Sequence, residues 1–332
     1  MNNSTLKKIL VIRFSSIGDI VLITPVLRGI KRQYPSAELH VLTKPAMASL
    51  LTANPNVNQV ITLGNSIVTT ALVLRAQQYD VVLDLHNNLR SAIIKLFLFN
   101  VKSFSFNKQN INKWLMVNAK QQRQLPHVVV RYLACAANIG VTNDGLGLDF
   151  YIEPDNQLSL ANEQLPTTYL AVVIGAKFKT KQLPVHQLIT LCTQLTMPII
   201  LIGGKDDGEL AQQLISALPN NKAIYNTCGK YNLQQSASLL AQAHSVITHD
   251  TGMMHIASAL GKKIITLWGN TTPALGFSAY LPSTVPAAIN IQNNNLNCRP
   301  CSKIGFMECP QGHFNCMNSL DMIAVAKLAN DN

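Results

Sequence analysis

The stretch SVITHDTGMMHIASALGKK (residues 245–263) joins a short apolar run, a polar turn with a glycine and a second apolar pattern. The run is rich in β-branched residues, which favours a buried strand. Asp250, Thr251 and Gly252 follow it, and Asp or Thr at such a position can cap a helix. The pattern predicts a strand, a tight turn and a helix that begins near Thr251. Because such a helix start leaves outward-pointing backbone N–H groups, it can bind a phosphate.

His255 lies about one helical turn beyond this predicted phosphate site, where its side chain can reach the same ligand. Gly252 has no Cβ, so a ligand can approach its backbone closely. The alternative is a capping aspartate beside a buried, hydrogen-bonded histidine that binds nothing. Local chemistry leaves both interpretations open.

Apolar, strand-like runs alternate with helical patterns along the whole chain. Strand-helix alternation predicts an α/β fold with parallel sheets. Residues 151–166 are polar, contain prolines and lack a clear period, so they indicate a linker between two doubly wound halves. The predicted strands are KILVIRF (8–14), AELHVLT (37–43), VNQVITL (57–63), YDVVLDLH (79–86), YLAVVIGA (169–176), MPIILIGG (197–204), KAIYNTCG (222–229), HSVITHDTG (244–252) and KKIITLWGN (262–270).

The composition is that of a folded protein with an anionic partner. The chain has 332 residues, 48% apolar and 13% charged, with a formal net charge of +11. No Asp or Glu occurs between Asp84 and Asp144. A basic interval of this kind indicates a surface for nucleic acid, acidic headgroups or a phosphorylated substrate, and the alternative is a solvated basic face. Its cations are Arg90, Lys95, Lys102, Lys108, Lys113, Lys120, Arg123 and Arg131.

The N-terminal region offers only residues 9–12 as an apolar run, whereas a secretory signal needs about 7–15 apolar residues. No window approaches the roughly 18 apolar residues of a membrane-spanning helix. We therefore expect a cytoplasmic protein whose seven cysteines are reduced.

Four ordered motifs resemble the ADP-heptose:lipopolysaccharide heptosyltransferases. The resemblance implies a GT-B architecture, in which two Rossmann-like domains with parallel sheets face a central cleft. It implies an acceptor-binding domain over residues 1–155, a nucleotide-sugar-binding domain over 156–317 and a C-terminal helix over 318–332 that packs back toward the first domain. The motifs are ILVIRFSSIGDIVLITPVLRGIKRQYPSAELHVLTKPAMASLLTANPNVNQVI (9–61), DLHNNLRS (84–91), GAKFKTKQLP (175–184) and VITHDTGMMHIASALGKKIITLWGNTTP (246–273).

The resemblance also implies the site residues. Asp19 corresponds to the family's proposed catalytic base, and a carboxylate can take the proton of an attacking hydroxyl. Lys181 would neutralise the diphosphate of the departing ADP, as a fixed ammonium can. The alternatives are a helix cap at Asp19 and a solvent-facing Lys181. The predicted donor-binding residues are Lys177, Gly203, Asp206, Tyr231, Asp250, Thr251, Gly252 and His255, and the predicted acceptor-binding residues are Gly18, His86 and Arg90.

The sequence provides no Asp-x-Asp pair of the kind that holds a divalent cation in many sugar transferases. Lysines and a helix start can replace that cation, so the inventory predicts metal independence and no cofactor. Four cysteines near the C-terminus leave several possibilities open: a structural metal, disulfides under oxidation, reduced packing, or an acceptor-side loop. These are Cys298, Cys301, Cys309 and Cys316, with His313 beside them.

The predicted function is an inverting, metal-independent transfer of heptose from ADP-heptose to the inner core of lipopolysaccharide. The resemblance implies an anionic glycolipid acceptor and peripheral contact with the cytoplasmic face of the inner membrane. One alternative is a GT-B nucleotide-sugar epimerase, which needs no lipid acceptor. The other is a non-enzymatic basic protein that binds nucleotides or nucleic acid, although no recognition motif for nucleic acid is present.

Overall fold

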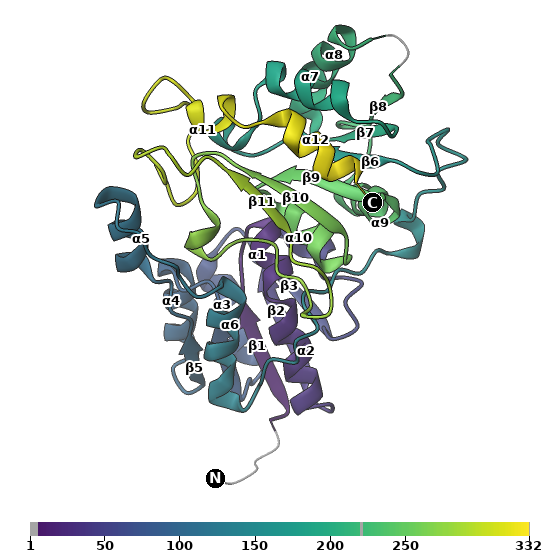
Figure 1. Ribbon diagram of the computed structural model, residues 1–332. Coiled ribbons are helices and arrows are strands. Elements are labelled where there is room, and N and C mark those ends of the chain that lie inside the picture. Colours follow the sequence, from purple (N-terminus) through teal and green to yellow (C-terminus); the bar gives the residue numbers. More distant parts are fainter. Residues whose placement is uncertain (1–5, 220–221, 332) are drawn as a thin grey trace. The chain divides into compact units, whose positions relative to one another are not determined.

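The computed structural model describes residues 6–219 and 222–331. The chain forms two compact units. The first unit comprises Met1–Lys108 and Pro126–Tyr151, and the second comprises Gln109–Leu125 and Ile152–Asn332. Each unit has one parallel sheet with helices packed against it (Figure 1). The predicted α/β class with two Rossmann-like sheets is confirmed.

The first unit has five strands in the order β3-β2-β1-β4-β5. All four strands predicted from apolar runs are present, and every pairing is parallel. The edge strand β5 was not predicted. The strands are β1 (Lys8–Ile12), β2 (Glu38–Thr43), β3 (Gln59–Thr62), β4 (Val81–Asp84) and β5 (Lys102–Ser105).

Two helices of the first unit, α3 (Ile67–Ala76) and α4 (Leu89–Phe97), pack on the core formed with β1, β2 and β4. The apolar pattern after β1 gives two helices, because the first ends before Ile23 and the second begins at Thr24, with Pro25 in its first turn. Proline is tolerated there because no intrahelical N–H is lost. The helices are α1 (Ile17–Leu22), α2 (Thr24–Gln33), α3 (Ile67–Ala76), α4 (Leu89–Phe97) and α6 (Val128–Ala136), with short 3₁₀ turns at Pro45–Leu50 and Ala137–Ile139.

The second unit has six parallel strands in the order β11-β10-β9-β6-β7-β8. The five predicted strands of this half are present, and the edge strand β11 was not predicted. The strands are β6 (Leu170–Val173), β7 (Ile199–Ile202), β8 (Ile224–Asn226), β9 (Ser245–His249), β10 (Lys263–Trp268) and β11 (Ile289–Gln292).

The helices of the second unit include a segment from the middle of the chain. Residues 109–125 belong to this unit because Met116 and Leu125 pack on Leu275, and the Leu125 N–H donates to the Ala274 carbonyl at 2.9 Å. The helices are α5 (Asn110–Asn118), α7 (Val185–Gln194), α8 (Gly208–Ala217), α9 (Leu233–Gln242), α10 (Gly252–Ala259), α11 (Asn315–Asn318) and α12 (Met322–Asn330), with 3₁₀ turns at Pro154–Asn156, Lys179–Lys181, Lys205–Asp207 and Pro273–Leu275.

The C-terminal helix α12 packs in the core of the second unit. Its buried residues Met322, Val325 and Ala329 join the cluster that contains Leu188 and Leu191 of α7. The domain boundaries at 155/156 and 317/318, and a return of this helix toward the first domain, stay predictions. Within residues 6–219 and 222–331, no helix has the length and apolar character needed to cross a bilayer.

Both sheets have a switch point, where the strand order changes direction. In the first unit it lies between β1 and β4, and in the second between β6 and β9. In open parallel sheets, ligands bind beyond the carboxyl ends of the strands at such a point. A functional site is therefore expected on the loops that follow these four strands.

Candidate active site

Asp19 lies just beyond β1, in the first turn of α1. The Ser16 N–H and the Ser16 hydroxyl donate to Asp19 Oδ2 at 3.1 Å and 3.0 Å, so the carboxylate caps this short helix. The same oxygen lies 2.7 Å from Nη2 of Arg13, and the Tyr132 hydroxyl donates to Oδ1 at 3.4 Å. Sequence reasoning found Asp19 but missed Arg13 and Tyr132. Gly18 is buried within the same helix.

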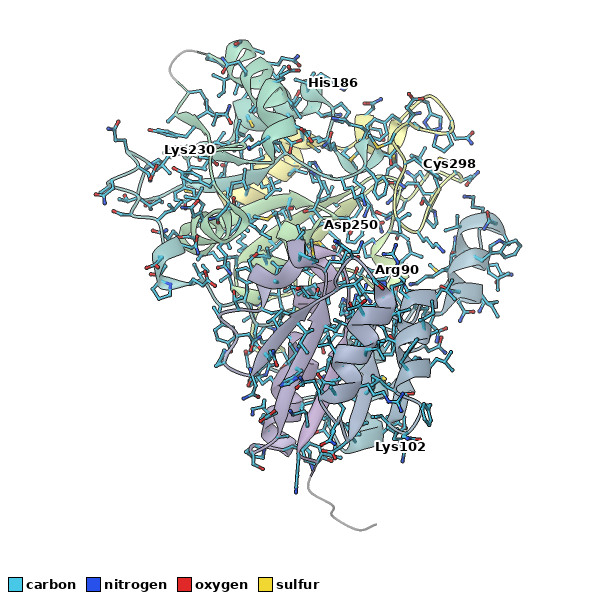
Figure 2. The ribbon with its side chains drawn as sticks, turned by 180° about the vertical axis from the view of Figure 1, so that it is seen from behind. Arg90, Lys102, His186, Lys230, Asp250 and Cys298 are labelled. Carbon is cyan, nitrogen blue, oxygen red and sulfur yellow. The ribbon has the colours of Figure 1, made fainter. Side chains whose placement is uncertain are left out.

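His86 and Arg90 follow β4 at the switch point of the first unit. The buried Asp84 accepts the backbone N–H groups of His86 and Asn87 at 3.1 Å and 2.6 Å, which fixes the turn after the strand. The His86 ring packs edge-on against Phe14, with 4.8 Å between ring centroids. Arg90 is exposed in the first turn of α4 (Figure 2).

The ring of His86 is kept neutral by its surroundings. Burial, followed by the charges of Arg13 and Lys108, lowers the pKa of His86 to about 4. At neutral pH the His86 ring therefore carries no positive charge. One of its nitrogens can donate a hydrogen bond to the acceptor substrate and the other can accept one. Gly18, His86 and Arg90 all lie on loops or helix starts that follow β1 and β4, at the carboxyl edge of the first sheet. Their role as acceptor-binding residues stays a prediction.

In the second unit, residues 245–263 form the predicted strand, turn and helix. β9 ends at His249, Thr251 is the N-cap residue in an extended conformation, and α10 begins at Gly252. Asp250, labelled in Figure 2, lies in the turn between them. His255 is buried on α10, about one turn from its start. The helix start therefore offers backbone N–H groups at the carboxyl end of a switch-point strand.

Lys181 contacts Asp250 at this helix start. Its Nζ lies 2.6 Å from Asp250 Oδ2 and donates to the Asp250 carbonyl at 3.2 Å. The Thr271 hydroxyl donates to the same carboxylate oxygen at 2.8 Å. Lys181 and Asp250 come from two different predicted motifs and are 69 positions apart in the sequence, and the fold brings them together. The resulting site joins a fixed ammonium to a helix start, and this combination suits a diphosphate.

His249, which sequence reasoning treated only as part of a strand, supports this arrangement. The Leu183 N–H donates to His249 Nε2 at 3.0 Å, so the strand end holds the turn that follows Lys181. Complete burial lowers the pKa of His249 to about 4, against a smaller opposing effect of Asp250. The neutral ring is therefore an acceptor for this N–H and a positioning group for Lys181.

The remaining predicted donor-binding residues lie elsewhere along the same sheet edge. Lys177 is exposed after β6, 5.6 Å from the centre of the Phe178 ring. Gly203 follows β7, and Asp206 lies in the exposed 3₁₀ turn beyond it. Tyr231 follows β8, and its hydroxyl donates to Glu163 at 2.5 Å. Gly203, Asp206 and Tyr231 therefore lie on the β7 and β8 side of the Lys181–Asp250 pair, whereas Lys177 follows β6.

Asp207, the neighbour of the predicted Asp206, is the more constrained of the two acids. It is buried, and its carboxylate accepts the Gly204 N–H at 2.8 Å and the Gln182 side-chain amide at 3.4 Å. A Cβ on Gly203 would lie 2.9 Å from Asp207 Cβ and 2.9 Å from Cys228 Sγ. Gly203 is therefore required by packing inside the unit.

The C-terminal cysteines are free thiols, as are all seven in the chain. Cys298 Sγ lies 4.0 Å from His313 Nε2, and the Cys301 thiol donates to the Cys298 carbonyl at 3.0 Å. Burial, followed by the neighbouring Cys298, raises the pKa of Cys301 to about 11. Over residues 6–219 and 222–331, no group of three or more His, Cys, Asp or Glu side chains is arranged to hold a metal ion.

Comparisons with known proteins agree with this arrangement. The family model of glycosyltransferase family 9 (heptosyltransferase) matches residues 69–310. The chain is 27% identical over 292 residues to lipopolysaccharide heptosyltransferase 2 of Salmonella typhimurium, covering 80% of this chain and 84% of that protein.

Two solved structures have the same fold. The family 9 glycosyl transferase of Veillonella parvula matches with a TM-score of 0.76 and 19% identity, over 97% of this chain and 96% of that one. The E. coli ADP-heptose lps heptosyltransferase II matches with a TM-score of 0.70 and 23% identity, over 96% and 99%. These similarities confirm the predicted GT-B class of fold. With its family model matched over most of its length, the chain belongs to glycosyltransferase family 9, the heptosyltransferase family, and is a glycosyltransferase.

Proposed function

We propose that this glycosyltransferase moves a heptose from ADP-heptose to the inner core of lipopolysaccharide, with inversion at the anomeric carbon and without a metal ion. Family membership supports the sugar, and the names of the similar proteins from Salmonella typhimurium and E. coli support the donor and the acceptor. The observation that carries the proposal is the contact between Lys181 and Asp250 at the start of α10. It provides positive charge and backbone donors where a nucleotide diphosphate would bind.

In the proposed reaction, the acceptor hydroxyl attacks the anomeric carbon while the bond from that carbon to the diphosphate oxygen breaks. The electron pair of the broken bond stays on ADP, and its charge is stabilised by Lys181 and the N–H groups of Gly252 and its neighbours. Lys177 can add a second ammonium, because it is exposed on the same loop. This positive charge performs the task that a divalent cation performs in other sugar transferases.

Asp19 takes the hydroxyl proton in the same step. A positioned carboxylate contributes typically about 10²–10⁴-fold to such a transfer. A single displacement by the acceptor reverses the configuration at the anomeric carbon, so the proposal predicts an inverting enzyme. His86 and Arg90, which follow β4, are proposed to contact the acceptor, Arg90 through an anionic group. Asp250 and His255 are proposed to contact the donor sugar.

The adenosine part of the donor is proposed to extend from α10 toward β7 and β8, along Gly203, Asp206 and Tyr231. The exposed carboxylate of Asp206 is available to the ribose hydroxyls. Tyr231 offers an aromatic ring beside its bond to Glu163. The buried Asp207 acts on this loop by fixing the Gly204 N–H, so it is a positioning residue in the proposal.

We also propose peripheral contact between the first unit and an anionic membrane surface. Leu89, Leu96 and Phe99 are 78%, 72% and 65% exposed on and just after α4. They lie within the interval that contains no carboxylate between Asp84 and Asp144. Exposed apolar side chains with surrounding cations suit a bilayer interface with acidic headgroups.

Vesicle co-sedimentation tests this contact. We expect the protein to bind vesicles that contain anionic lipid, less at high salt, and to bind neutral vesicles weakly. The variant Leu96→Ser should reduce the bound fraction, whereas Ile323→Ser, at an exposed position of α12 in the second unit, should leave it unchanged. Equal binding to neutral and anionic vesicles would contradict the proposal.

The catalytic proposal is tested by incubating the protein with ADP-heptose and lipopolysaccharide from a heptose-deficient strain. We expect ADP release and a mass increase of one heptose on the acceptor, in the presence of a metal chelator as well as without it. Incubation without acceptor serves as the control. Isomerised nucleotide sugar in that control, with no transfer when acceptor is added, would show an epimerase instead.

A further inference from the structure

Arg13 is a buried cation that the proposed mechanism has so far not used. It lies directly after β1 and is 7% exposed. Its Nε donates to the Ser15 carbonyl at 2.8 Å, and its Nη1 donates to the Leu85 carbonyl at 2.6 Å. Its Nη2 lies 2.7 Å from Asp19 Oδ2. Because every nitrogen of the planar group has a partner, the guanidinium is held in one orientation.

Tyr132 of α6 connects this guanidinium to the other carboxylate oxygen. Its hydroxyl accepts from Arg13 Nη1 at 2.8 Å and donates to Asp19 Oδ1 at 3.4 Å. The side chain is completely buried, and its ring packs edge-on against Phe106, with 4.8 Å between centroids. Burial raises the pKa of Tyr132 well above its usual range, so the hydroxyl remains a donor at every pH of interest.

We propose that Arg13 and Tyr132 are positioning residues that hold the carboxylate of Asp19 in one orientation and keep it ionised to accept the proton of the acceptor hydroxyl. This inference rests on the proposed role of Asp19 as the base. Ser16 alone would hold Asp19 as an ordinary helix cap through Oδ2. The contact from Tyr132 involves Oδ1, so the two sides of the carboxylate have different partners.

The charges around Arg13 agree with this role. Burial by itself lowers the pKa of Arg13, but the charge and hydrogen bonds of Asp19 and Tyr132 outweigh that effect and raise the pKa above its ordinary value. The same attraction favours the ionised form of Asp19, because the stabilisation of an ion pair is mutual. Two further titratable groups interact with this cluster: Arg131, with Tyr132 and Asp19, and His86, with Arg13 and Asp19. Lys108 and Asp84 in turn act on His86.

The alternative is that the Arg13–Asp19 pair only stabilises the fold. A structural role would change the unfolding temperature and the amount of folded protein. It would not change the pH dependence of kcat, because that profile reports the ionisation of groups in the enzyme-substrate complex. The pH profile therefore separates the two roles.

The experiment measures kcat, donor KM and the pH profile of kcat for full-length Tyr132→Phe. This variant keeps the buried ring and removes only the hydroxyl. We expect kcat to fall about 10-fold with donor KM unchanged, because the general base contributes up to about 10⁴-fold and is misplaced but not removed. The acid limb should move to higher pH, since a hydrogen bond to the ionised carboxylate is lost.

Two further variants keep the test decisive. Arg13→Met removes the cation beside the half-buried Asp19 carboxylate and empties a buried guanidinium site, which can prevent folding. Arg13→Lys, which keeps the charge but loses the planar set of donors, is therefore the variant to measure. We expect a similar fall in kcat for Arg13→Lys. The matched control is Tyr79→Phe, which removes the hydroxyl of another buried tyrosine of the first unit, one paired with His40 at 2.9 Å. It should retain the wild-type profile.

The result for Asp19→Asn separates the role of Asp19 as the base from the positioning role of Arg13 and Tyr132. If this variant keeps the wild-type kcat, Asp19 is not the base and the inference fails together with that assignment. If Asp19→Asn is inactive while Tyr132→Phe and Arg13→Lys match the wild type in kcat and in the pH profile, only the positioning role is wrong. A shift of the same size in Tyr79→Phe would also overturn it.

Discussion

Replacing Lys181 by alanine should weaken both the binding of ADP and the rate of transfer. Lys181 Nζ lies 2.6 Å from Asp250 Oδ2, and the two side chains are 15% and 12% exposed, so the pair is shielded from most of the solvent. A hydrogen bond to a charged group contributes about 1.5–3 kcal/mol. Because the diphosphate competes with an existing ion pair, we expect a loss of about 2 kcal/mol, or about 30-fold in the Kd of ADP.

The rate should fall further than the affinity. In the transition state the leaving diphosphate gains negative charge, and removing one fixed donor from such a charge costs about 10²-fold in kcat. Calorimetric titration with ADP gives the Kd, and steady-state transfer gives kcat. Compared with Lys181→Ala, Lys181→Arg should bind ADP more tightly and have a higher kcat, because arginine restores the positive charge although its side chain has a different shape. High salt should reduce the difference in ADP affinity between Lys181→Ala and the wild type, because salt screens the charge of the lysine.

The matched control for this experiment is Lys327→Ala, which removes an exposed lysine of α12 in the same unit. Its Kd and kcat should equal those of the wild type. An unchanged Kd for ADP in Lys181→Ala, within about twofold at low salt, would refute the reasoning, because a 2 kcal/mol contact has a far larger effect. A thermal unfolding scan excludes misfolding as the cause of any loss.

Three other changes give independent tests. Asp19→Asn should lower kcat by about 10²–10⁴-fold with an unchanged Kd for ADP, measured by calorimetry, because the base is lost and the nucleotide contacts remain. Gly203→Ala should lower the free energy of unfolding by about 1–3 kcal/mol in a denaturant titration, since its Cβ would lie 2.9 Å from Asp207 Cβ and Cys228 Sγ. Stability should fall as the pH drops from about 6.5 toward 4, by up to about 3 kcal/mol for His249, because the unfolded chain binds that proton before the folded chain does. His249→Gln should lose this part of the pH dependence in unfolding titrations at pH 7, 5 and 4, and an undiminished slope would contradict it.

Much of the fold could be predicted from local patterns, because a strand buried on both faces must be apolar throughout. All nine expected strands are present, from β1 to β10 with the exception of β5, and seven of them lie inside a sheet, whereas β3 and β8 are edge strands whose apolar residues still gave a signal. The missed strands β5 and β11 are edge strands, and their residues are mostly exposed or half-buried. An edge strand requires no continuous apolar run, so KSFS and INIQ gave no signal.

The site was predictable where a single sequence motif contains both the functional side chains and the strand, turn and helix that position them. The turn from Asp250 to Gly252 and the helix that presents His255 are one such case. Residues that hold a site residue in place from a distant part of the chain could not be recognised from the motifs. Tyr132 is 119 positions from Arg13, and His249 bonds to a residue 66 positions away. Sequence also gave no way to tell which of two adjacent acids, Asp206 or Asp207, is buried.

The most direct test of the central claim is a crystal structure of the protein with ADP-heptose bound. The account predicts the diphosphate at the start of α10, within hydrogen-bond distance of the Gly252 N–H and of Lys181 Nζ, with the sugar beside His255. A nucleotide bound anywhere else in the second unit, with Lys181 still paired to Asp250 and away from phosphate, would contradict it.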